Sequence, residues 1–556
     1  MGNTSPEKGQ TMFRALLMQK AKSQGINDPS FRISIDSGRS PTLSYTFKNP
    51  VTGQYSGIEN VVIEWGDGTS TQLISEDDKN VTVGKLTHTY VEGKVWQIKM
   101  TSSDGKIPPF NFNTDTLLVS VDSSLCSMTA KNGSPVTDFT NFFANCSNLG
   151  NVCGNLFSQN PNITSFNKCF YNCTSLTNLP STVFAGCTKN TNMFQSFGNC
   201  TSLTALPAGL FSDFVNVSTY YSCFSTCTSL KTIPSGLFDT NSSVTNFSQT
   251  FMNCNSLETI PDGLFDHCDK VTTFSQCFSG CARLAAIPEG LFNTSTNVIT
   301  FTQTFSGCQT LESIPAGLFD HCSKVTSFAM CFNGCSALLS IPPAFFKGFA
   351  SVTDFSQCFA NCTNLPSIPD EIFADCTGAV KFSSCFASCK ALVDIPSSVF
   401  RNCSAARLFD RTFSMCMALT GLPSGIFDTN LAATSFSNCF YYCNKLKTVP
   451  SGLFARNSLV TDFSSCFNAC TSLVLASDLF TDDTIPAGSR FASAETINFT
   501  NCFSRGSYSY GIETGSAPEL WNCSFSMVPT SSGCFGGNGN SANSLSNYSQ
   551  IPASWK

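Results

Sequence analysis

The sequence predicts an α/β solenoid of about thirteen units, preceded by an all-β module of antiparallel strands. Three observations predict the solenoid: one cysteine recurs every 27 residues without a slip, a Phe stands three residues before each, and a Leu three residues after each. A fixed period of roughly 20–50 residues is typical of repeat proteins, in which each unit buries its apolar face against its neighbours. We call this column the cysteine ladder: Cys146, Cys173, Cys200, Cys227, Cys254, Cys281, Cys308, Cys335, Cys362, Cys389, Cys416, Cys443 and Cys470.

Each unit is expected to open with a helix of two to three turns. In the unit 271–297 the apolar residues have the spacing of one helix face: Phe274, Cys277, Phe278, Cys281 and Leu284. Thr272 or Thr273 is expected to cap the helix. The residue before the ladder cysteine is Asn or Gly in eight of thirteen units. Because these two residue types tolerate left-handed backbone, we expect that conformation at the end of the helix.

The rest of each unit reads as a short extended stretch and a return loop. The stretch Leu-x-x-Ile ends at a Pro in eleven consecutive units, which is consistent with a strand end because proline lacks an amide hydrogen. A second buried Phe follows, at position 292 in this unit, and then a loop of Ser, Thr, Asn and Asp.

The cysteines are interpreted as small apolar packing residues. Twenty-six of the 31 fall in three columns: the ladder, a column four residues before it and a column fourteen residues after it. A metal site is disfavoured because a ladder spreads its thiols along an axis, whereas zinc needs four converging ligands. His267 and His321 lie two units apart, about 10 Å at the usual strand spacing, and could not share an ion. We expect no metal, no cofactor and no catalytic residue, and whether any cysteines form disulfides is left open.

The flanking regions differ from the repeats in pattern. Residues 1–29 include an amphipathic segment that is either a mobile leader or a docking helix, and residues 30–122 alternate apolar and polar side chains as in antiparallel strands. Residues 123–480 form the solenoid. Residues 481–556 lose the period and are expected to cap its last open coil.

Composition argues against several classes of partner. Charged residues make up 12% of the chain and the net charge is −6, so a nucleic-acid partner is not expected. No apolar run is long enough to span a membrane, and the first residues do not resemble a secretory signal. Many cysteines without such a signal indicate synthesis in a reducing compartment.

Two stretches resemble known families. The unit FDTNSSVTNFSQTFMNCNSLETIP is similar to the BspA-like repeat of bacterial surface proteins, which has about 26 residues and is a divergent leucine-rich repeat. This resemblance implies a leucine-rich-repeat-like solenoid used for adhesion or recognition. The segments WGDGT (65–69) and HTY (88–90) resemble the PKD family of immunoglobulin-like β-sandwiches, which implies a spacer or binding module, although Trp96 stands where that family often has Tyr. Asp67 and His88 are interpreted as turn residues.

These observations predict a non-enzymatic adhesion or recognition protein. The leading interpretation is a phage virion appendage, a fibre or decoration protein made in the bacterial cytosol, with a bacterial cell-surface adhesin of the BspA type as the alternative and a glycan depolymerase as a third. Expected partners are a host cell-surface protein or glycan, and other virion proteins through the N-terminal segment; an oligomer is left open. The exposed part of Leu-x-x-Ile is the most variable, and its charged residues are the candidate ligand contacts: Lys231, Glu258, Glu312, Asp394 and Lys447.

Overall fold

The computed structural model describes residues 30–37, 43–75, 77, 79–481, 491, 495–504, 514–536 and 545–556. It consists of two compact units, which we treat separately. Unit 1 comprises Met1–Leu257 and Gly263–Lys270, and unit 2 comprises Glu258–Asp262 and Val271–Lys556. The amphipathic segment expected within residues 1–29 lies outside the described residues.

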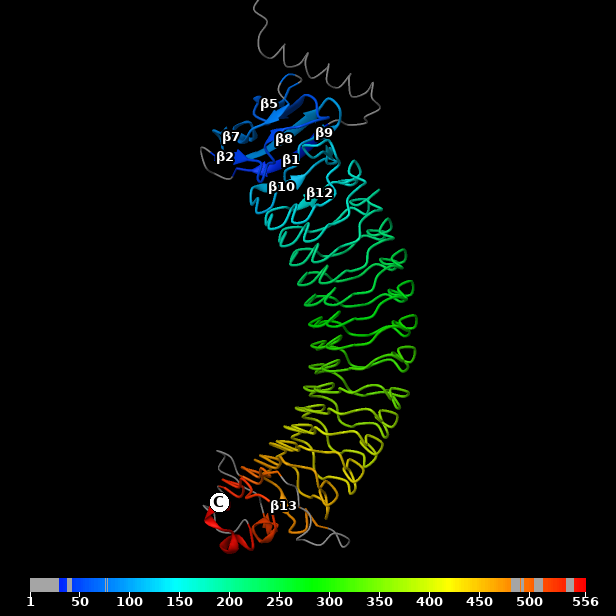
Figure 1. The fold of residues 1–556 in the computed structure, drawn as a ribbon, viewed down its shortest axis with the longest axis vertical. Helices are drawn as coiled ribbons and strands as arrows, with labels where there is room; N and C mark the ends of the chain where they lie inside the picture. Colours follow the sequence, from blue (N-terminus) through cyan, green and yellow to red (C-terminus); the bar gives the residue numbers. More distant parts are fainter. Residues whose placement is uncertain are drawn as a thin grey trace, which may run out of the picture. The chain divides into compact units, whose positions relative to one another are not determined.

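The N-terminal part of unit 1 is built from β-strands, as the alternating pattern predicts (Figure 1). Its largest sheet has the order β12-β10-β1-β8-β4-β5. These six strands are β1 (Ser30–Asp36), β4 (Val61–Glu64), β5 (Ser70–Ile74), β8 (Val95–Ser102), β10 (Leu118–Val121) and β12 (Asn151–Val152). All neighbours in it are antiparallel except β10 and β12. Because β12 belongs to the first repeat, the sheet runs across the domain boundary predicted after residue 122.

Three two-stranded sheets complete the strands of unit 1. They are β2 (Leu43–Thr46) with β7 (Thr87–Tyr90), β3 (Gly53–Gln54) with β6 (Asn80–Val81), and β9 (Lys106–Ile107) with β11 (Ser127–Met128). The short 3₁₀ helix η1 (Val83–Leu86) leads into β7. That the module is a PKD-like sandwich remains a prediction from the resemblance.

The WGDGT segment forms a turn after β4, as that resemblance implies. Asp67 accepts hydrogen bonds from the amide and hydroxyl of Thr69 at 3.0 and 2.6 Å, and its other oxygen lies 2.6 Å from Nε2 of His88. Burial acts to raise the pKa of the Asp67 carboxyl, but the hydrogen bonds from Thr69 and His88 outweigh it and lower that pKa. The His88 ring also stacks on Trp65, with 5.1 Å between centroids. These contacts are those of a structural turn.

In the repeats each 27-residue period forms one coil, and within each unit the coils stack on one another (Figure 1). The expected helices are absent: the described residues contain no α-helix, and the segment before each ladder cysteine is a chain of tight turns. The α/β assignment is therefore wrong for the repeats. They are held by turns and by isolated parallel bridges, for example Thr273↔Thr300↔Ser327 in unit 2 and Ser165↔Asn192↔Thr219 in unit 1.

Backbone hydrogen bonds explain why a helix does not form. In the coil that contains Cys308, every second amide donates to a carbonyl of the following coil, at 2.6–2.9 Å: Gln303, Phe305 and Gly307. The alternate amides close turns by donating to the carbonyl three residues earlier: Thr304, Ser306 and Cys308. An α-helix would commit each of these amides to the carbonyl four residues earlier within one coil. In the stacked coils, half of these amides instead donate hydrogen bonds to the neighbouring coil.

Left-handed backbone at two positions per coil makes these turns. The residue before the ladder cysteine has positive φ in all thirteen coils, which confirms the predicted position, although it ends a turn and not a helix. The residue five before that cysteine is also left-handed in all thirteen coils, for example Gln276 (φ 59°) and Arg411 (φ 55°). Positive φ at the third residue of a turn is the type II arrangement. Because Gln, Ser, Lys, Met and Arg occupy this second position as well as Asn, the sequence does not indicate it.

Phenylalanine columns form the core of the coils. In unit 1 the rings three residues before the ladder cysteine stack from Phe170 through Phe197 and Phe224 to Phe251, with centroids 5.2–5.6 Å apart and planes within 8°. In unit 2 the same column continues from Phe278 to Phe467 at 5.2–5.7 Å. Each buried ring removes a large apolar surface from water, and such burial stabilises a core by about 1.5–3 kcal/mol per side chain. The columns thus supply the buried apolar surface that a repeat lacks by itself.

The described part of 481–556 carries two further, irregular coils before the chain ends. Phe503 stacks on Phe467 and Phe535 on Phe503, at 5.7 and 5.4 Å. The remaining elements here are β13 (Val474–Leu475) paired with β14 (Thr514–Gly515), and the 3₁₀ helices η2 (Leu520–Asn522), η3 (Tyr548–Gln550) and η4 (Ala553–Trp555). The amide of Phe535 donates to the carbonyl of Trp555, which is buried. The core column therefore runs further than the sequence indicates.

Candidate functional site

The predicted ligand residues all lie on the surface of the coils. The middle residues of these stretches lie between a buried Leu and a second apolar residue, most often a buried Ile or Leu, and all five predicted contacts are exposed: Lys231, Glu258, Glu312, Asp394 and Lys447. We call this row of middle residues the Lxx strip. In several coils one amide ties the strip to the preceding coil, as in Lys231 to Thr204 (3.1 Å) in unit 1 and Lys447 to Thr420 (2.9 Å) in unit 2, whereas Pro366 at this place has no amide hydrogen. The strip therefore has a fixed backbone and variable side chains.

The strip does not gather these five residues into one cluster. Lys231 belongs to unit 1 and the other four to unit 2. Within unit 2, Glu258 and Glu312 are two coils apart, and Asp394 lies three coils further on, which at the usual strand spacing gives about 10 and 15 Å. Such a row suits an extended ligand that contacts several coils.

The cysteine ladder is buried, as the packing interpretation predicts: 29 of the 31 cysteines are buried. The structure adds a role that the sequence did not suggest. Along the ladder Sγ donates to the carbonyl of the Phe one coil earlier, at 3.1–3.5 Å, as in Cys200 to Phe170 and Cys389 to Phe359. Cys146, the first of the ladder, donates to the carbonyl of Phe112 in the N-terminal module at 3.0 Å. The thiol is thus a hydrogen-bond donor between coils.

Burial makes these thiols unreactive. It raises the pKa of Cys200, Cys335 and Cys389 to about 12, because an ionised sulfur would lose its hydration. A thiolate is the nucleophile and the metal ligand, so thiols held neutral perform neither role. Among the described residues, no group of three or more His, Cys, Asp or Glu side chains is placed to hold a metal ion.

The two other cysteine columns use the same contact with different donors. Where the column four residues before the ladder has a hydroxyl, it donates to the preceding coil, as in Ser196 to Phe166 (2.8 Å) and Thr304 to Phe274 (3.1 Å). In the column fourteen residues after the ladder, Asn430 fills the place of a cysteine, and its amide donates to the carbonyls of Phe400 and Cys403. These positions therefore require a small side chain that can donate a hydrogen bond.

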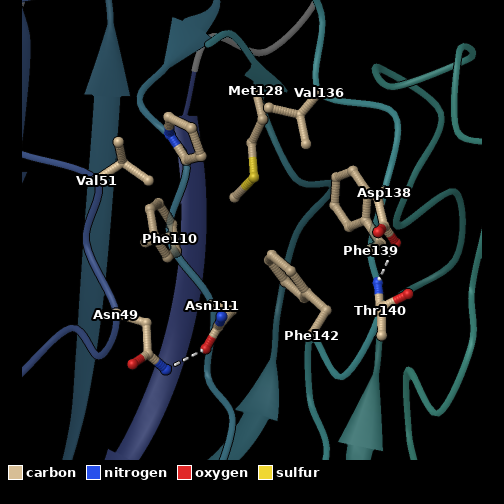
Figure 2. Close-up of a pocket in the computed structure, with 11 residues that line it drawn as sticks. Asn49, Val51, Phe110, Asn111, Met128, Val136, Asp138, Phe139, Thr140 and Phe142 are labelled. Carbon is tan, nitrogen blue, oxygen red and sulfur yellow. Dashed lines mark hydrogen bonds between the residues drawn. The ribbon is translucent and has the colours of Figure 1, made fainter. Parts of the chain in front are cut away.

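A pocket of about 130 Å³ lies in unit 1, between the β-module and the first coil (Figure 2). Its floor is apolar, with Phe110, Phe139 and Phe142 buried around Met128. Its rim is polar: Asn49 donates to Asn111 at 2.7 Å, and Asp138 accepts from the amide of Thr140 at 2.9 Å (Figure 2). The pocket is smaller than the roughly 300–1,000 Å³ of typical ligand sites, and Figure 2 shows its polar groups engaged with each other.

Sequence reasoning missed a group of surface aromatic residues in unit 1. Phe194 and Tyr221 occupy the same position in adjacent coils, and their rings stack at 5.1 Å with planes 5° apart. The Lys168 ammonium lies 5.8 Å from the ring centroids of both Tyr171 and Phe194. All four side chains are half-buried. We call Tyr171, Phe194 and Tyr221 with Lys168 the aromatic cluster. An alignment of the coils by their 27-residue period would have revealed it, because Phe194 and Tyr221 then fall at the same position.

Part of the chain matches a known family model. Residues 191–282, 217–345 and 263–372 match the model described as "Mycoplasma protein of unknown function, DUF285". Comparison with curated proteins gives no match.

Several solved structures are similar at low identity. A leucine-rich cell-surface protein of Faecalibacterium prausnitzii is 17% identical, with 78% of this chain and 94% of that chain covered and a TM-score of 0.27. The Drosophila Toll–Spätzle complex gives 13% identity, coverage of 63% and 42%, and a TM-score of 0.34. The complex of TLR13 with ssRNA13 gives 13% identity, coverage of 64% and 55%, and a TM-score of 0.23. This chain therefore spans less than two thirds of the Toll and TLR13 chains, and at these scores the likeness does not bear on function.

The stacked coils, joined by parallel bridges and each with a buried Leu three residues after the ladder cysteine, make this a leucine-rich-repeat-like protein. The BspA-type surface repeat that the sequence resembles is consistent with the stacked coils and with the family match. The PKD-like identity of the N-terminal module is not established by either.

Proposed function

We propose that the protein is a non-enzymatic recognition protein displayed on a bacterial cell surface, where it binds a host-surface protein or glycan. The observation that carries the proposal is the Lxx strip. Its backbone is tied coil to coil by hydrogen bonds, while its exposed side chains differ from one coil to the next. A rigid support with variable exposed residues is the arrangement by which repeat proteins bind extended partners.

The chemistry of the described residues supports binding over catalysis. The exposed acidic residues of the strip stand singly on separate coils along one surface, whereas glycoside hydrolysis needs two carboxyl groups that face each other across the scissile bond in a cleft. His88, which contacts the Asp67 carboxylate, holds the WGDGT turn against β7 and serves a structural role. A depolymerase activity remains the less favoured proposal, and release of sugar from host polysaccharide would establish it.

Location at the cell surface follows the BspA-type resemblance. A virion location is the second proposal. No helix among the described residues has both the length and the apolar character to cross a membrane. Labelling intact cells with an antibody to the protein, beside mass spectrometry of purified virions, distinguishes the two locations.

The binding proposal is tested by adhesion of the purified protein to host cells. The double variant Glu312→Lys and Asp394→Lys reverses two charges on the strip of unit 2 and is expected to reduce binding at least about tenfold. The matched control reverses two exposed charges on the return loops of the same unit, Asp320→Lys and Asp428→Lys, and should bind as wild type. Equal loss in both variants, or in neither, contradicts recognition through these strip positions.

A further inference from the structure

The aromatic cluster of unit 1 is not required to build the coil. Phe194 and Tyr221 stand six residues before their ladder cysteines. In the eleven other coils this position is Ser in six, as at Ser248 and Ser275, and otherwise Thr, Asn, Ala or Asp. Those coils have the same turns and the same left-handed residues. Two adjacent aromatic rings at a place that small polar residues fill therefore need another explanation.

The Tyr171 ring also has room because the equivalent residue of the next coil has no side chain. It stands two residues before its ladder cysteine, and the residue at this place in the next coil is Gly198. A Cβ on Gly198 would lie 3.1 Å from the Tyr171 ring, closer than most such contacts. The φ of Gly198 does not require glycine, because it is absent from the positive-φ residues. The missing side chain thus leaves room for the ring to lie across the coils.

A row of amides runs beside the rings. Asn172 donates to Asn145, and Asn199 donates to Asn172, one coil after another. Asn172 follows Tyr171 directly in the chain, and both amides are half-buried at the same surface. The cluster therefore offers apolar ring surface, amide groups and one ammonium group within three adjacent coils.

This combination matches the chemistry of a hexopyranose. One face of such a ring is lined by C–H groups, which pack on an aromatic ring, while its hydroxyls exchange hydrogen bonds with amides and an ammonium group. A single-stranded nucleic acid also stacks on aromatic rings, but it needs a positively charged groove that follows its backbone. The cluster contains one lysine, and the chain carries a net charge of −6. The charge favours a neutral sugar.

We propose that the aromatic cluster of unit 1 is a glycan-binding site that takes neutral hexopyranose units of an oligosaccharide. This rests on the proposed recognition function and names the ligand class of a second surface, separate from the Lxx strip. Tyr171, Phe194 and Tyr221 provide the stacking surface, and Lys168, Asn172 and Asn199 contact the hydroxyls.

The test is calorimetric titration of the full chain with cellohexaose, maltohexaose, mannohexaose and galactohexaose. We expect at least one of them to bind, and Phe194→Ser/Tyr221→Ser to weaken that binding at least about tenfold. The variant carries the Ser that other coils have here, so its circular dichroism spectrum should be unchanged. Phe194→Tyr should retain binding. Tyr441→Ser, which removes another half-buried surface aromatic residue in unit 2, is the matched control and should bind as wild type.

Two results would overturn the proposal: no binding of any of the four sugars, or equal binding by wild type and the double Ser variant. Binding of poly(U) that is lost in the same variant would assign the cluster to nucleic acid instead. Host-cell adhesion is measured in parallel. Adhesion of wild type without any sugar binding refutes the glycan site alone, whereas failure of wild type to adhere refutes the recognition function, whatever the sugars do.

Discussion

Mild alkali is expected to unfold the repeats, because their buried thiols must then ionise. Burial raises the pKa of Cys200, Cys335, Cys389 and Cys443 from the ordinary value of 9.0 to about 12. A group whose pKa is higher in the folded state stabilises that state fully below its unfolded pKa. Here the unfolded chain loses protons first, so stability falls as the pH rises from about 9 to about 12.

The size of the effect follows from the number of thiols. At pH 10 a thiol with an unfolded pKa of 9.0 and a folded pKa of about 12 stabilises the unfolded chain by about 1 kcal/mol. The three columns hold 26 cysteines over thirteen coils, two per coil on average, so a coil with two such thiols loses roughly 2–3 kcal/mol. A coil of 27 residues at the usual stability per residue contributes about 1.4–4 kcal/mol. The two magnitudes are comparable, and unfolding is expected by about pH 10.

The assay follows far-ultraviolet circular dichroism and thiolate absorbance together as the pH is raised, and both should change in one transition. The matched variant Cys331→Thr/Cys385→Thr replaces two thiols by the residue found at Thr304 and Thr412 of the same column. Its stability should fall less between pH 7 and pH 10 than that of the wild type, with its alkaline midpoint shifted upward. A gradual rise of thiolate absorbance near pH 9, with the circular dichroism of the folded protein retained, would refute the reasoning.

Three further predictions concern single sites. A thiol reagent at pH 8 should modify at most Cys153 and Cys523 of the native protein, the two cysteines that are not buried, and all 31 after denaturation; fast reaction of more than two would contradict the ladder's burial. Arg411→Gly should raise the free energy of unfolding by roughly 0.5–1 kcal/mol, because it relieves left-handed backbone at a non-glycine residue. The control Arg407→Gly, at a residue without positive φ that directly precedes the bridge residue Leu408, should lower it by a similar amount; chemical denaturation measures both, and equal signs would argue against the left-handed assignment. Tyr45→Phe should destabilise the β-module by about 1–3 kcal/mol, since it removes the hydroxyl that donates at 2.8 Å to a buried carboxyl; an unchanged melting temperature would show that this bond contributes nothing.

Much of the repeat architecture was predictable because its signal is periodic. The ladder, the phenylalanine columns and the left-handed residue before each ladder cysteine all recur at fixed positions, and the structure confirms them. The exposed position of the Lxx strip also follows from its place between a Leu and an Ile. What the strip binds does not follow, because exposure alone does not name a ligand.

The helix was predicted wrongly for a specific reason. Apolar residues at i, i+3, i+4 and i+7 fit one face of a helix, but they fit equally a chain of tight turns that returns to the core after three or four residues. The second left-handed position breaks a helix. Because Gln276, Arg411 and most of their equivalents are neither Gly nor Asn, the sequence does not indicate this left-handed position. Nor does a cysteine in a sequence reveal whether it only packs or also donates its hydrogen to another coil.

By itself the sequence determined that this chain repeats, which side chains are buried, and that its thiols lie in columns, because burial depends on periodicity within the chain. Only the tertiary structure decided which acceptors the backbone amides of each coil hydrogen-bond to. Half of the turn amides find their acceptors 26 residues away in the next coil, as Phe305 does in Cys331. The same stacking brings Phe194 beside Tyr221 and makes the ladder thiol a donor to the preceding coil, since contacts between coils exist only once the coils are stacked.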